Sequence, residues 1–172
     1  MAVAPACRID RRNLCKLLVL PVWISSLTLG ILTARYSAHF LTPMVQSAVG
    51  LEPTFPALLR SAVLPFLLSA FAVFLSEPWL LLPICSMKAF GFGFCASGVY
   101  LAFGTAGWLV RFLFLFTDVL VIPILLFYCL RQLRSEKSFH LIETLTFVGI
   151  SSAIAAVDYY VIAPFLVSIM DF

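Results

Sequence analysis

Long apolar runs alternate with short polar connections along this chain. The five runs lie at residues 17–34, 57–76, 79–103, 108–130 and 141–167. A helix needs about 20 mainly apolar residues to cross the roughly 30 Å hydrocarbon core of a bilayer, and these runs approach or exceed that length. The pattern therefore predicts an all-α fold in which five transmembrane helices form one membrane domain over residues 1–172.

The connections between the runs differ in length and composition. Segment 35–56 is the longest, and its mixed composition indicates a partly ordered loop with a short interfacial helix at 42–49. Segments 76–78 and 104–107 contain the Pro and Gly residues that are typical of tight turns. Segment 131–138 carries several charges and is predicted to be a solvated loop.

Composition supports the membrane interpretation. Hydrophobic residues make up 63% of the chain and charged residues only 11%, and the mean hydropathy is +1.10. Soluble domains are typically about 25% charged, so a water-soluble fold is excluded. The net charge of +3 does not form the basic face that nucleic acid binding requires, so nucleic acid is not an expected partner.

Basic residues are distributed unevenly over the two faces that five helices would create. One face carries seven of them: Arg8, Arg11, Arg12, Lys16, Arg131, Arg134 and Lys137. The other face carries three: Arg35, Arg60 and Arg111. Because cytoplasmic loops are enriched in Lys and Arg, we expect a cytoplasmic N-terminus and an external C-terminus. Segment 131–138 would then be cytoplasmic and segment 35–56 external.

The sequence contains no recognisable catalytic or metal-ligand constellation. The five cysteines form no CxxC pair and have no His at ligand spacing, which favours small packing residues over a zinc site or a disulfide framework. Ser151 has no base at usable spacing, and His39 and His140 are predicted on opposite faces. We therefore expect no enzymatic activity, no cofactor and no metal.

Lys88 lies within an otherwise apolar run. A charge at the bilayer centre costs about 2.5–3.5 kcal/mol on insertion scales, so its side chain should face protein or water. Lys88 precedes Thr105 by 17 residues and Asp118 follows it by 13. At about 1.5 Å per residue, their depths in a helical hairpin differ by only about 6 Å. We predict that Lys88 and Asp118 pair, the alternative being a separate polar pocket for each.

Small residues recur along the third run. In membrane helices such residues allow two backbones to approach closely, so we expect Gly91, Gly93 and Gly98 to lie at helix contacts. A stripe of small residues would continue from Gly91 through Cys95 and Gly98 to Ala102. The GxG spacing does not indicate a nucleotide site, because no strand precedes it.

Pro123 follows Asp118 by five residues. Proline removes a backbone donor and frees the carbonyl near residue 119. Pro123 has two interpretations. It is either a structural bend alone, or a kink that places the Asp118 carboxylate beside a free backbone carbonyl, where the two would hold an ion or a proton.

Asp158 lies toward the external half of the last run. It directly precedes Tyr159 and Tyr160, which fit an interfacial aromatic belt. Asp158 is expected to be half solvated there or to contact Arg111.

Several motifs together resemble the stage II sporulation protein M family of bacterial membrane proteins. They are Leu82-Pro83, Met87-Lys88-Ala-Phe-Gly91-Phe-Gly93-Phe, Gly107-Trp108, Asp118 with Ile122-Pro123, and Asp158 with Pro164. The resemblance covers roughly residues 56–168. The family tends to carry an amide or a glutamate near the position of Asp118, so the resemblance does not itself imply pairing at Asp118.

The resemblance implies a polytopic scaffold in a bacterial cell membrane, at the septum during sporulation and engulfment. Members hold extracytoplasmic peptidoglycan hydrolases for cell wall remodelling and are not themselves catalytic. Implied partners are the lipid bilayer and such hydrolases or other membrane proteins, with self-association left open. The alternative is a small transporter or permease subunit with a midplane polar site at Lys88 and Asp118, since a buried charge pair, a glycine-rich helix and a proline bend are also features of transporters.

Overall fold

The protein folds into a bundle of helices. The computed structural model describes residues 11–49, 54–75, 77–104, 115–134 and 141–170, and these residues contain no strand. The helices are α1 (Arg11–Tyr36), α2 (Ala38–Val49), α3 (Phe55–Phe74), α4 (Leu81–Phe103), α6 (Phe116–Arg134), α7 (Leu141–Val157) and α8 (Ala163–Met170). A 3₁₀ turn, η1 (Pro78–Leu80), precedes α4, and a π-helical segment, η2 (Asp158–Ile162), joins α7 to α8.

The prediction of an all-α fold with five long apolar helices is confirmed. The segments Asn13–Tyr36, Phe55–Phe74, Leu81–Phe103, Phe116–Arg134 and Leu141–Phe165 are long and apolar enough to cross a membrane. Many of their large apolar side chains are exposed in the isolated chain, including Leu17, Met87 and Ile142. A surface of this kind is suited to lipid as its solvent.

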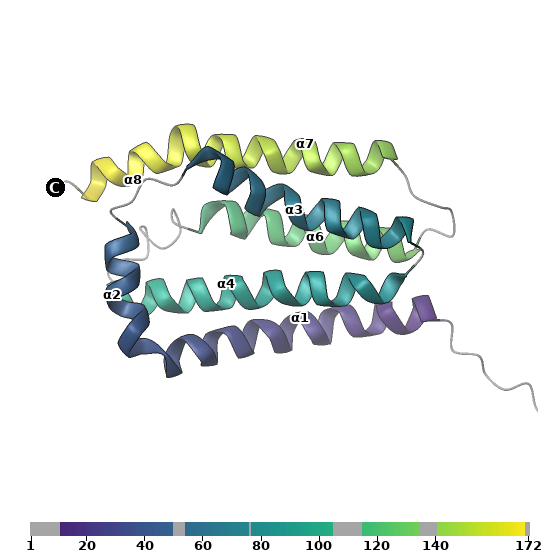
Figure 1. The fold of residues 1–172 in the computed structure, drawn as a ribbon, viewed down its shortest axis with the longest axis horizontal. Helices are drawn as coiled ribbons and strands as arrows, with labels where there is room; N and C mark the ends of the chain where they lie inside the picture. The colour runs from purple at the N-terminus through teal and green to yellow at the C-terminus, as the bar shows by residue number, and fades with distance from the viewer. Residues whose placement is uncertain (1–10, 50–53, 76, 105–114, 135–140, 171–172) are drawn as a thin grey trace, which may run out of the picture.

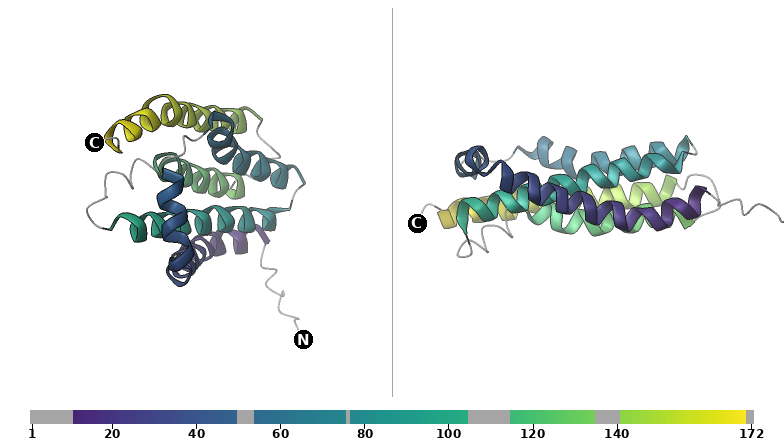
Figure 2. Two further views of the ribbon diagram at one scale, coloured as in Figure 1. Left: turned by 60° about the vertical axis from the view of Figure 1, so that its left-hand side comes forward. Right: turned by 90° about the horizontal axis from the view of Figure 1, so that it is seen from below.

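The five long helices run side by side along roughly one direction, with α3 tilted, and α2 crosses one end of the bundle (Figure 1). We name this the α2 end; α1 and α4 finish there, and α3 and α6 start there. The opposite end, where α6 finishes at Arg134 and α7 starts at Leu141, is named the Arg131 end. The right-hand view in Figure 2 shows the same elongated bundle from below, and the left-hand view shows it turned toward the α2 end.

Several expected boundaries differ from the observed ones. The expected loop 35–56 is mostly helix, because α2 spans Ala38–Val49 rather than 42–49. The reason is packing: Leu41 is only 9% exposed and lies against Gly98 of α4. Residues 131–134 belong to α6 rather than to a loop, since basic side chains such as Arg131 and Arg134 are favourable in the last turn of a helix.

The other boundaries shift by a few residues or fall outside the described ranges. Helix α1 is longer at both ends than the expected 17–34, and α3 ends before 76. The expected fourth run began at 108, whereas Leu115 is in a turn and α6 begins at Phe116, with 108–114 outside the described residues. Gly104 ends α4 with a φ of 62°, a conformation that glycine adopts without the steric cost of a Cβ.

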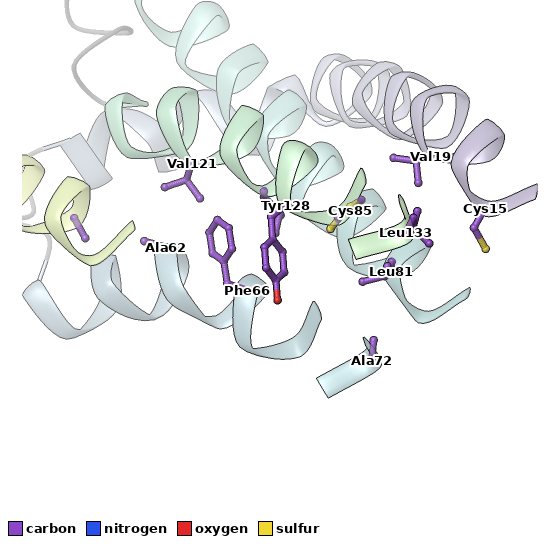
Figure 3. Packing of buried hydrophobic residues seen from close by; sticks show 13 residues of the cluster. Cys15, Val19, Ala62, Phe66, Ala72, Leu81, Cys85, Val121, Tyr128 and Leu133 are labelled. Carbon is purple, nitrogen blue, oxygen red and sulfur yellow. The ribbon is translucent and has the colours of Figure 1, made fainter. Parts of the chain in front are cut away.

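An aromatic cluster holds α3, α6 and α7 together. The Phe66 ring meets Tyr128 edge-on, with centroids 5.7 Å apart, and stacks on Phe147 at 6.2 Å. Tyr128 and Phe66 are fully buried, and Figure 3 shows their rings side by side. The Tyr128 hydroxyl lies 2.8 Å from the Thr144 hydroxyl, so this buried polar group has a hydrogen-bond partner.

Helices α1 and α4 run parallel and approach each other through glycine. A Cβ added at Gly93 would lie 2.4 Å from the Leu27 carbonyl oxygen, and one added at Gly30 would lie 2.3 Å from the Phe90 carbonyl oxygen. The hydroxyls of Ser26 and Ser86 lie 2.7 Å apart between the same helices. This close approach is the small-residue packing that membrane helices use.

The predicted packing roles of the glycines are correct in part. Gly93 contacts α1 and Gly98 contacts α2, but a Cβ at Gly91 would meet no described atom within 4 Å. Cys95, from the same expected stripe, is exposed. The close approach to α1 is instead at Gly93 and at the backbone of Phe90 and Phe94. Gly91 and Gly93 lie two residues apart on one helix, so only the position of the neighbouring helix selects between them. Pro123 is exposed on α6 and is not buried in a helix contact.

Candidate functional site

A partly buried ion pair joins α4 to α6. The Lys88 ammonium lies 2.5 Å from an Asp118 carboxylate oxygen, and the two side chains are 14% and 25% exposed. The same ammonium donates to the hydroxyl of Ser61 at 3.0 Å and to its backbone carbonyl at 3.3 Å. The predicted contact between Lys88 and Asp118 is therefore confirmed, with a third helix, α3, as an unpredicted partner.

A second polar contact lies next to this ion pair along α6. The hydroxyl of Thr117 donates to a carboxylate oxygen of Asp158, which is only 7% exposed. Asp158 starts the π-helical segment η2, in which the Ala163 amide donates to the Asp158 carbonyl. Single-turn π segments inside α-helices are rare and occur frequently at functional sites. The expected half-solvated position of Asp158 is wrong, because the side chain is buried against α6.

These contacts together form a polar layer. Its members come from α3, α4, α6 and η2, and they are Ser61, Lys88, Thr117, Asp118 and Asp158. An ammonium group has three protons to donate, and Lys88 has three acceptors within reach. The lysine is thus fully satisfied by protein groups, and the layer ties four elements together in surroundings where an unpaired charge is costly.

A groove of about 490 Å³ lies beside the polar layer, between α3 and α4. One part of the groove is polar and is lined by Arg60, Ser61 and Lys88. The rest is apolar, with a lining that includes Leu64, Leu68, Ile84 and Met87. Clefts that hold small ligands typically have volumes of about 300–1,000 Å³, so the groove is large enough for one. No carboxylate is paired with Arg60 within the described ranges.

The remaining predicted residues are located as follows. Arg111 lies outside the described residues, so its expected contact with Asp158 is not tested. Cys85 and Cys129 lie with their sulfur atoms 3.5 Å apart in the core, and Cys15 is also buried, which fits the packing role expected for them. Over the described part of the chain, no group of three His, Cys, Asp or Glu side chains is placed to hold a metal ion.

The sequence contained signals for some of the partners that were not predicted. Thr117 directly precedes Asp118, so a helix places its hydroxyl about 100° round from the carboxylate and toward another neighbour. Ser26 and Gly30 have the small-xxx-small spacing that marks a helix contact. Ser61 offered no signal, because serine is common in apolar helices and its partner depends on how α3 is positioned.

A second ion pair lies at the Arg131 end, far along α6 from the polar layer. The guanidinium of Arg131 donates to both carboxylate oxygens of Glu143, at 2.7 and 3.2 Å. The Arg131 and Glu143 side chains are 53% and 28% exposed, against 14% and 25% for Lys88 and Asp118. This contact links the end of α6 to the start of α7.

Comparison with known proteins gives no relative from which to assign a role. No protein-family model, curated protein or solved structure matches the chain.

Proposed function

We propose that the protein is a non-catalytic scaffold in a bacterial cell membrane, with its α2 end facing the extracytoplasmic side. The scaffold would hold a cell wall hydrolase, as the resemblance to the stage II sporulation protein M family implies. The distribution of basic residues supports this orientation, because Arg11, Lys16, Arg131 and Arg134 lie at the Arg131 end.

The observation that carries the proposal is the two-sided character of α2. Leu41, on the face of α2 that meets the bundle, packs against Gly98 of α4, and this contact fixes α2 across the end of the bundle. Phe40 and Met44, on another face of α2, are 78% and 66% exposed, and the nearby Tyr36 is 92% exposed. Exposed aromatic and Met side chains on a fixed element are typical of interaction surfaces.

The polar layer supports a structural role for the charged residues. Lys88 and Asp118 satisfy each other, and Ser61 completes the contacts of the lysine. An internal ion pair of this kind specifies which helices are neighbours without requiring a substrate.

The test is photocrosslinking in cells of the host that makes the protein. A photoreactive amino acid at position 40 or 44 is expected to crosslink to an extracytoplasmic wall hydrolase, identified by mass spectrometry. Phe40→Ser should abolish co-purification of the hydrolase, whereas Leu17→Ser, at a similarly exposed position near the opposite end, should leave it unchanged. Crosslinks to lipid alone at both positions would contradict the proposal.

The groove beside Lys88 favours one alternative, a small transporter or permease subunit with its substrate site at Lys88 and Asp118. The two functions separate with the double variant Lys88→Met/Asp118→Leu, which removes both charges together. A transporter would lose flux in proteoliposomes, whereas a scaffold would keep its hydrolase partner.

A further inference from the structure

We propose that the groove between α3 and α4 is a binding site for one anionic phospholipid. In a bilayer this groove opens sideways from the bundle, since Leu64, Leu68 and Met87 along it are 40%, 46% and 76% exposed. The inference requires only that the helices span a membrane, so it holds for a scaffold and for a transporter alike.

The groove has a cationic part and an apolar part. Helices α3 and α4 run in opposite directions, and Lys88 meets α3 at Ser61. Residues before Lys88 in α4 therefore lie beside residues after Ser61 in α3, which places Ile84 and Met87 with Leu64 and Leu68. Arg60 and Lys88 mark the part nearer the α2 end. A ligand with an anionic head and a hydrocarbon tail matches this division.

Arg60 is the residue that would contact the head group. The three protons of Lys88 already have acceptors in Asp118 and Ser61, and the Asp118 carboxylate neutralises its charge, so Lys88 offers the head group neither a free donor nor a net charge. Arg60 is exposed, and no hydrogen bond or ion pair occupies it within the described residues. It lies five residues from the start of α3, about 7.5 Å along the axis, from where its long side chain can reach the head-group region.

The apolar part of the groove suits an acyl chain. From Arg60 to Leu68 the α3 backbone advances about 12 Å, which gives a chain a continuous apolar wall. Basic pockets between transmembrane helices are known to bind anionic head groups. Here the apolar residues beside Arg60 add a site for the acyl chain of the same lipid.

The test uses the full-length protein in phosphatidylcholine vesicles that contain a trace of photoactivatable lipid. The label, on the end of an acyl chain, is carried either by phosphatidylglycerol or by phosphatidylcholine. Phosphatidylglycerol is expected to label peptides that contain residues 64–68 or 84–87 preferentially. Arg60→Gln should reduce that preference by about fivefold, as expected for removing one cation that faces an anionic head group.

Two variants control for charge and for shape. Arg35→Gln removes an exposed cation from the same end of the bundle without touching the groove, so it should keep the preference. Leu64→Trp fills the groove with its charges intact and should remove labelling there by both lipids. Unfolding curves of all three variants that match the unmodified protein would show that the bundle is intact.

Three results would overturn the proposal. Equal labelling by the two lipids would mean that the groove does not recognise an anionic head group, and labels confined to other helices would mean that it holds no lipid. Competition by millimolar inorganic phosphate would assign the cationic part to a free anion rather than to a phospholipid.

Discussion

Helix α4 has two very different interfaces. Toward α1 it offers Gly93 and the backbone of Phe90, and the two backbones touch so closely that an added methyl group would collide. Toward α6 it offers Lys88, whose side chain bridges to Asp118. In lipid, apolar contact alone distinguishes poorly between a helix and the surrounding acyl chains. Close fit and polar pairing are two solutions to that problem, and this small bundle uses both on one helix.

The two interfaces should fail in different ways. The α1–α4 contact depends on shape and should respond to single methyl groups. The α4–α6 contact depends on charge, so it should respond to the loss of one partner and recover when both are lost.

The largest effect is expected from Lys88→Ala. This change leaves the Asp118 carboxylate without its counter-charge, which costs about 3 kcal/mol for a partly buried pair. Unfolding by SDS in mixed micelles measures the loss of stability. A change below about 1 kcal/mol, the value typical of exposed pairs, would show that the pair is effectively solvated.

A smaller effect is expected from Gly93→Ala. The new Cβ would lie 2.4 Å from a backbone oxygen of α1, so the helices must separate, at a cost of about 1–3 kcal/mol for overpacking. Gly91→Ala is the matched control, two residues away on the same helix with open space at its Cβ position. Gly91→Ala should be neutral or stabilising, because alanine favours a helix more than glycine does. An equal loss of stability from both substitutions would show that the α1 contact is not what Gly93→Ala disturbs.

The smallest effect is expected from Arg131→Ala at the Arg131 end. Its pair with Glu143 is more than half exposed on the arginine side, and exposed pairs contribute about 0–1 kcal/mol. Raising the salt concentration should remove what effect remains, because exposed charges are screened. A salt-independent loss as large as that of Lys88→Ala would remove the distinction between the two ion pairs.

The sequence predicted the parts of this fold that depend on composition and helical rise. Five apolar runs and the depth match of Lys88 with Asp118 follow from the length of each run and from about 1.5 Å per residue. The rotation of a helix about its axis does not follow from either. That is why Gly91 was assigned to a helix contact, although only Gly93 of these two glycines meets α1.

The sequence also did not predict some contacts between residues that are far apart in the chain. Asp158 was expected at the interface, yet η2 turns it toward Thr117 of α6. A π segment has no strong sequence signature, and the helix pattern around Asp158 continues on both sides of it.

The most direct test of this account is a double-mutant cycle on Lys88 and Asp118. Lys88→Met, Asp118→Leu and the double variant are each unfolded in the same mixed micelles, with Gly91→Ala as the reference for an uncoupled change. We predict that the double variant is about 2 kcal/mol more stable than the summed losses of the two single variants, within the range seen for residues in direct contact. Strictly additive losses would contradict it, because they would mean that the two charges do not depend on each other in the folded bundle.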